Sequence, residues 1–183
     1  METLIRLASA IDRLNLMVGK GLSMLMPLVV GLAASVVLLR YALNVGYPWL
    51  SETFIWLNGV IFTLGAAYLL VIDQHVRVDV LYARMSVRCQ AVMHILGVTL
   101  LMWPMVYAIG ITGWPSVYRS ILAMEQSATM GGLPVMYLLK ACIPLFCVLV
   151  ALQGLSMVIR AIAVLSGHSE TLRPAHLESQ NHV

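Results

Sequence analysis

Four long apolar segments divide the chain and predict four membrane-spanning helices. Asp, Glu, Lys and Arg are all absent from residues 21–39, 53–72, 89–118 and 141–159. About 20 apolar residues, each rising about 1.5 Å along a helix, cross a hydrocarbon core of about 30 Å. The third segment is longer than this thickness requires, so we expect its helix to project beyond the bilayer or to bend at Pro104 or Pro115. The pattern predicts an all-α membrane protein.

Residues 3–18 show the period of an amphipathic α-helix. Apolar side chains recur at Leu4, Leu7, Ala8, Ile11, Leu14 and Val18, and the other face carries Glu2, Arg6, Asp12, Arg13 and Asn15. The pattern predicts a short helix in the membrane interface, separated from the first span near Gly19 and Gly21. The alternative is an extension of the first span on the cytoplasmic side. A cleaved signal peptide is a further alternative, although the 19-residue apolar run exceeds a normal signal h-region.

The end of the chain differs in composition from the rest. Residues 167–183 are polar and have no apolar period, so we expect a disordered cytoplasmic tail. Residues 1–166 then form a single four-helix transmembrane domain. Composition agrees, because the chain is 61% hydrophobic and only 10% charged, too little charge for a surface that faces water.

Basic residues predict the orientation. Eight of the eleven Lys and Arg residues fall on the side of the two termini and the middle loop, and three fall on the other side. The positive-inside rule therefore places both termini in the cytoplasm, an N-in/C-in arrangement. The net charge of +3 is too small to indicate a nucleic-acid partner.

Residues that carry enzyme chemistry are sparse. Three cysteines without a Cys-x-x-Cys pair make neither a disulfide framework nor a redox motif. His94 is the one ionisable side chain inside an apolar run, and no second intramembrane histidine could complete a haem site. His75 and Asp79 make an incomplete metal site, and Asp79 also suits a helix cap. We therefore expect no enzyme activity, metal site or cofactor in this chain.

One stripe of the second span combines aromatic, acidic and small residues. Trp49, Glu52, Trp56 and Gly59 share one helix face, and Pro48 fits the first turn. An aromatic belt at the membrane surface accounts for Trp49. It does not account for a carboxylate one turn into an apolar helix. We expect Glu52 to pair with Arg40 across the first hairpin, or with a partner subunit, because an unpaired charge in the bilayer is costly.

The ordered residues around this stripe resemble a known family. They are Arg40, Asn44, Trp49, Glu52, Trp56 and Gly65, followed by His75, Arg77 and Asp79. Their order and spacing are similar to the small permease subunit of tripartite ATP-independent periplasmic (TRAP) transporters, the DctQ type. The resemblance is strongest over residues 40–88. Beyond Arg119 it is loose and rests on Glu125, Ser127, Pro134 and Lys140.

The resemblance implies a scaffold role within a larger complex. In that family a periplasmic binding protein delivers an organic acid to a large permease subunit, which holds the substrate and sodium sites. The expected partners are the large subunit, the binding protein and membrane lipids, with sodium bound by the large subunit. The nine residues from Arg40 to Asp79 are candidates for the partner interface. Two alternatives stay open: an accessory four-helix subunit of another tripartite carboxylate transporter, and the membrane anchor of a redox complex.

Overall fold

The computed structural model describes residues 2–72 and 86–166, and all regular structure in these residues is helical. The elements are α1 (Glu2–Ser23), α2 (Met26–Ala42), α3 (Pro48–Val71), α5 (Val87–Gly97), the π-helical η1 (Val98–Met102), α6 (Trp103–Leu122) and α7 (Met136–Leu165). They form four helical segments long and apolar enough to cross a membrane: Glu2–Ala42, Pro48–Val71, Val87–Leu122 and Met136–Leu165. The predicted all-α membrane fold with four spans is confirmed. The predicted disordered tail lies outside the described residues.

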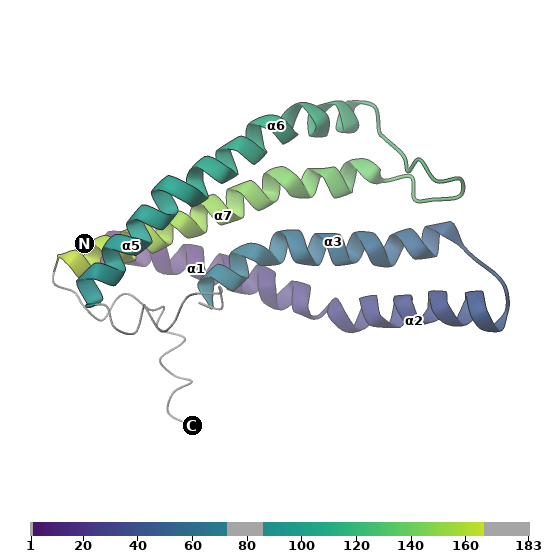
Figure 1. Cartoon of the computed structure of the whole chain (residues 1–183), viewed down its shortest axis with the longest axis horizontal. Coiled ribbons are helices and arrows are strands. Elements are labelled where there is room, and N and C mark those ends of the chain that lie inside the picture. Colours follow the sequence, from purple (N-terminus) through teal and green to yellow (C-terminus); the bar gives the residue numbers. More distant parts are fainter. Residues whose placement is uncertain (1, 73–85, 167–183) are drawn as a thin grey trace, which may run out of the picture.

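The four spans lie side by side in a single layer. Helix α2 packs against α3, α3 against α7, and α7 against α6, while α1 crosses α3 and α7 at one end of the layer and α5 packs on α7 (Figure 1). Ala67, Val106, Leu149 and Val150 form the apolar centre where α3, α6 and α7 meet. A single layer leaves two broad faces uncovered. Even in α7, the most enclosed span, only 33% of the residues in the most apolar stretch are buried.

The first span breaks at a place that the sequence analysis misjudged. Helix α1 runs through Gly19 and Gly21 to Ser23, and the interruption falls at Met24 and Leu25. Pro27 follows as one of the first residues of α2. A proline ring clashes with the carbonyl four residues earlier, here that of Ser23, and it has no amide to donate. Pro27 therefore sets the break, and the glycines do not.

The long third span contains a π-helical turn directly before Pro104. Between α5 and α6, the amide of Trp103 donates to the carbonyl of Val98, five residues back. Pro104 follows directly, where an α-helix would need an amide and would place the ring against the carbonyl of Leu100. The wider turn removes that conflict. The whole segment of 36 residues is about 54 Å long, so it projects beyond a hydrocarbon core of about 30 Å, as expected from the sequence.

Helix α1 turns an unexpected face toward the other helices. Ala8, Ile11, Asp12, Asn15 and Gly19 are buried, whereas Leu4, Leu7, Leu14 and Met17 are exposed. The sequence analysis placed Asp12 and Asn15 on the polar, outward face. They point inward because α7 offers polar partners there. The helix is also longer than the short interfacial element that the pattern predicted, at 22 residues.

We predict opposite effects of alanine at two glycines of α1. A Cβ at Gly19 would lie 2.1 Å from Cγ of Tyr68 on α3, whereas a Cβ at Gly21 meets nothing within 4 Å. Gly19→Ala should lower the thermal stability of the purified protein by about 1–3 kcal/mol through overpacking. Gly21→Ala should be neutral or raise it by up to about 1 kcal/mol, because alanine favours the helix. Equal thermal unfolding midpoints for the two variants in detergent would contradict the α1–α3 contact.

Candidate functional site

The carboxylate of Glu52 fastens the loop between α6 and α7 onto the start of α3. Its Oε2 accepts a hydrogen bond of 2.8 Å from the amide of Leu133, and its Oε1 accepts one from the hydroxyl of Ser127. Pro48 begins α3, so Glu52 lies one turn in, at the end of the layer where the loops lie. A carboxylate that accepts a backbone amide and a hydroxyl in this way holds both groups more firmly than a neutral acceptor would.

Two consecutive glycines shape this loop around Glu52. Gly131 has φ of 75°, a left-handed conformation that side chains disfavour. A Cβ at Gly132 would lie 2.6 Å from Oε2 of Glu52, so any larger residue would push the carboxylate away. The Gly132 amide donates to Thr129 and the Ser127 amide to Leu133, at 2.9 and 3.1 Å. The result is a closed loop with Met130, 94% exposed, at its tip.

An ion pair closes the base of the same loop. Nζ of Lys140 on α7 lies 2.5 Å from Oε2 of Glu125, and both side chains are partly exposed. The hydrogen bond from Lys140 holds the pKa of Glu125 below its ordinary value of 4.5. Because the folded state favours the ionised form, this contribution to stability is present at neutral pH. It is lost as the pH falls from 4.5 through the lowered pKa.

The structure brings the two halves of the resemblance together. Ser127 belongs to the part of the chain that resembles the family only loosely. Its hydroxyl donates a hydrogen bond to Glu52, in the hairpin that resembles the family strongly. The expected pair between Glu52 and Arg40 is not formed: Arg40 is exposed and has no ion pair with any described residue. Glu52 is occupied by the α6–α7 loop instead, which the sequence could not place beside it. Its charge is stabilised within the chain.

The remaining candidate interface residues are spread along the first hairpin. Asn44 has φ of 52°, a left-handed conformation that asparagine tolerates, in the turn between α2 and α3. Trp49 is half exposed, with its ring centroid 6.2 Å from that of Tyr47, and Trp56 is partly buried. His75, Arg77 and Asp79 lie outside the described residues. Their assignment to a partner interface stays a prediction.

A buried polar network joins α1 to α7 at the opposite end of the layer. Oδ2 of Asp12 accepts from Nη2 and Nε of Arg160, at 2.5 and 3.1 Å. Its Oδ1 accepts from Ser156 Oγ and Gln153 Nε2, at 2.7 and 2.9 Å. Asp12 is 2% exposed and Arg160 is 7% exposed. The carboxylate therefore has four donors and the cation has an acid partner, which burial of both charges requires.

The network extends to Asn15, one turn further along α1. Its Nδ2 donates to Oε1 of Gln153 at 2.7 Å. Sequence reasoning missed this site, although a signal exists. Gln153, Ser156 and Arg160 are spaced by three and four residues, so they form one polar stripe on an otherwise apolar helix.

The two polar clusters are separated along α7 by about the thickness of the hydrocarbon core of a membrane. Twenty residues separate Lys140 from Arg160 along α7, which is about 30 Å of helix. This equals the usual thickness of the hydrocarbon core, about 30 Å. The Glu125–Lys140 pair and the Asp12–Arg160 pair therefore fit the two edges of the core, with α7 spanning it between them.

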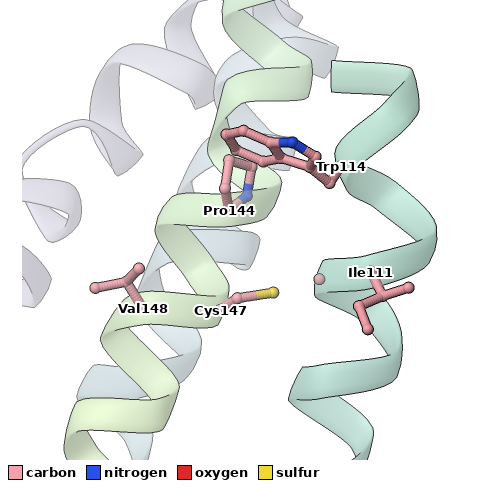
Figure 2. A pocket seen from close by; sticks show the side chains of 6 residues that line it. Ile111, Trp114, Pro144, Cys147 and Val148 are labelled. Atoms are coloured by element: carbon pink, nitrogen blue, oxygen red, sulfur yellow. The ribbon is translucent and has the colours of Figure 1, made fainter. Parts of the chain in front are cut away.

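An apolar groove of about 460 Å³ lies between α6 and α7. Figure 2 shows Trp114 over Pro144, and the sulfur of Cys147 pointing toward α6. All six lining residues are apolar: Gly110, Ile111, Trp114, Pro144, Cys147 and Val148. The groove offers no side chain that would hold an organic anion or a sodium ion. Among the described residues, no group of three or more His, Cys, Asp or Glu could hold a metal ion either.

One face of α3 is exposed at four positions and partly exposed at a fifth, Gly65. Ile55, Asn58, Phe62, Gly65 and Leu69 recur at helical spacing, and Phe62 is 82% exposed. A Cβ at Gly65 would meet nothing within 4 Å, so this glycine is not needed for packing within the described helices. The Asn58 side chain is exposed and makes no hydrogen bond within residues 2–72 and 86–166. This face is called the α3 stripe below.

Removing the Glu52 carboxylate should release the α6–α7 loop. In a Glu52→Ala variant, the Leu133 amide and the Ser127 hydroxyl lose their acceptor, so we expect proteases of broad specificity to cut residues 125–133 several-fold faster. Glu2→Ala is the matched control, because Glu2 is exposed at the other end of the layer. Cleavage products can be identified by mass spectrometry of detergent-purified protein. Identical cleavage of Glu52→Ala and the parent protein would show that the carboxylate does not hold the loop.

Comparison with known proteins gives one family. The family described as "Tripartite ATP-independent periplasmic transporters, DctQ component" matches residues 29–164, most of the chain. The matched region includes the α3 stripe, Glu52 with its loop, and the α7 side of the buried network. Comparisons with curated proteins and with solved structures gave no match.

Proposed function

Because this chain belongs to the DctQ family, the small membrane component of TRAP transporters, we propose that it is the scaffold that supports the large permease subunit. The complex would carry out sodium-coupled, binding-protein-dependent uptake of an organic acid across the bacterial inner membrane. The substrate and the sodium ions belong to the large subunit in this proposal. The chain itself is a multi-pass membrane protein and a transporter component, not an enzyme. The family assignment leaves no observation in favour of a redox anchor.

The α3 stripe is the observation that carries the proposal. An exposed amide such as Asn58 in a membrane span costs free energy against lipid and is stabilised by a hydrogen bond from another helix. Gly65, seven residues further on the same face, would let a partner helix approach closely. Gly31 on α2 likewise has open space around its Cβ position. These features suit packing against a protein helix better than against hydrocarbon chains.

The internal contacts suit a rigid support. Each end of the layer carries a polar cluster that ties elements far apart in sequence: Glu52 to the α6–α7 loop, and Asp12 to Arg160. Such clusters fix helix positions more strictly than apolar packing alone. A support whose helices are fixed at both edges of the bilayer would provide a rigid surface against which the partner subunit could move.

Co-purification tests the contact with the large subunit. Gly65→Leu would fill the space on the α3 stripe without a clash inside the chain, so we expect it to lower the yield of large subunit recovered with the tagged chain. Gly97→Leu is the matched control, because a Cβ at Gly97 also meets nothing within 4 Å, but on α5. Equal recovery with the two variants would contradict an interface on the α3 stripe.

We also propose the N-in/C-in orientation, which rests on the eight-to-three distribution of basic residues. In a cysteine-free background, single cysteines at Val45 and Met130 should react with an impermeant thiol reagent in intact spheroplasts. Both residues are exposed and lie in the loops at one end of the layer. A cysteine at Arg6, at the other end, should be protected until the membrane is opened. The reverse labelling pattern would invert the orientation.

A further inference from the structure

The outward face of α1 carries a surface groove of about 620 Å³ with a smaller polar part and a larger apolar part. Arg6, Ser9 and Arg13 line one part, and the apolar residues Ile5, Ala10, Leu14 and Met17 line the rest. Arg6 and Arg13 are seven residues apart, two helical turns, so they lie on the same side of the helix. Both arginines are exposed, as are Leu14 and Met17. The groove therefore offers two cations next to a hydrophobic surface.

The groove lies at an edge of the membrane rather than within it. Arg13 directly follows Asp12, whose contact with Arg160 marks one edge of the hydrocarbon core along α7. Arg6 lies about two turns nearer the N-terminus, on the water side, and Met17 lies about one turn beyond Arg13, toward α2 and the core. The order from cation to apolar side chain thus follows the order from lipid headgroup to acyl chain.

The two arginines are free to bind an external anion. Arg6 has one acidic neighbour, Glu2, with the charged atoms 4.0 Å apart and both side chains almost fully exposed. A pair of this kind contributes little to stability and exchanges easily with other partners. Arg13 has no ion pair among the described residues. The buried cation beneath this face, Arg160, is already neutralised by Asp12, so it does not compete for an anion.

From this geometry we infer that the outward face of α1 binds an anionic phospholipid. The guanidinium groups of Arg6 and Arg13 hold the phosphate of the headgroup, and an acyl chain lies along Leu14 and Met17. Inorganic phosphate shares the charge but has no chain to fill the apolar part of the groove. The buried contacts of Asp12 keep α1 fixed to α7, so a lipid held here would fix the position of the scaffold in the bilayer. The inference does not depend on the proposed transport role or on the orientation.

The full-length chain, purified in detergent, allows a direct test by native mass spectrometry with added lipid. We expect phosphatidylglycerol to bind more tightly than phosphatidylcholine. The double variant Arg6→Gln/Arg13→Gln should bind phosphatidylglycerol roughly 30-fold more weakly, from the usual contribution of two basic residues near an anionic lipid surface. Arg40→Gln/Arg119→Gln removes two arginines at the opposite end of the layer and should leave the affinity unchanged. Arg6→Lys/Arg13→Lys keeps the charge and should retain most of the binding.

Three results would overturn the inference. The first is unchanged phosphatidylglycerol affinity in the glutamine variant, and the second is an equal loss in the Arg40/Arg119 control. The third is stabilisation by inorganic phosphate that matches phosphatidylglycerol in a thermal unfolding assay, which would indicate a simple anion site. An unfolding midpoint without lipid serves as the folding check. It should be the same in all variants, because every substituted side chain is exposed.

Discussion

An Asp12→Asn variant should lose about 3–5 kcal/mol of stability, the largest effect that we expect from a single substitution in this chain. Asparagine keeps the size of the side chain and can still accept from Ser156. The amide group that replaces Oδ2 cannot accept a hydrogen bond, so the change removes the negative charge and the acceptor of the two hydrogen bonds from Arg160. The guanidinium of Arg160, 7% exposed, would then lose the buried carboxylate that accepts two of its hydrogen bonds. Thermal unfolding in detergent, followed by size-exclusion chromatography, would measure the loss.

The expected effect depends on the pairing and not on the mere presence of an acid. Glu2→Gln is the matched control, because Glu2 is an acid on the same helix that neighbours an arginine, with its side chain 93% exposed. It should unfold at the temperature of the parent protein. Adding Arg160→Gln to Asp12→Asn removes the buried cation that has lost this carboxylate and should recover part of the stability. A fully additive double variant would mean that Asp12 and Arg160 do not interact.

The fold was largely predictable because the spans depend on a local pattern. Charge-free segments of 19 residues or more predict membrane-spanning helices, and the structure confirms four helices that are long and apolar enough to span a membrane. The irregular points were harder. Pro27 and Pro104 were visible in the sequence, but the break before Pro27 and the π-helical turn before Pro104 result from the carbonyl four residues earlier. A proline indicates that the helix is disturbed, and the surrounding backbone determines whether a break or a π-helical turn results.

The polar contacts were less predictable because they join distant parts of the chain. Asp12 looked like an outward residue of an amphipathic helix, and only the polar stripe of α7, more than 140 residues later, turns it inward. Glu52 was recognised as unusual, but Arg40 was the wrong partner. The loop that holds it depends on the left-handed Gly131 and on the close approach of Gly132, which no periodic pattern indicates.

Uptake by a reconstituted complex should depend completely on this chain. In the described residues the groove between α6 and α7 is apolar, and no group of three or more His, Cys, Asp or Glu could hold a metal ion. This agrees with the proposal that the substrate and the sodium ions bind to the large subunit. The α3 stripe and the rigid clusters at both ends of the layer support a role in holding that subunit in place. Omitting the chain should therefore abolish uptake even when the large subunit and the binding protein are present.

The decisive measurement is uptake of candidate organic acids into liposomes with an inward sodium gradient and an added binding protein. Liposomes would contain this chain alone, the large subunit alone, or both. The scaffold account predicts uptake only when both membrane subunits are present, and background levels with either one. Robust uptake by this chain alone would show that it transports solute itself. Full uptake by the large subunit alone would show that no scaffold is needed.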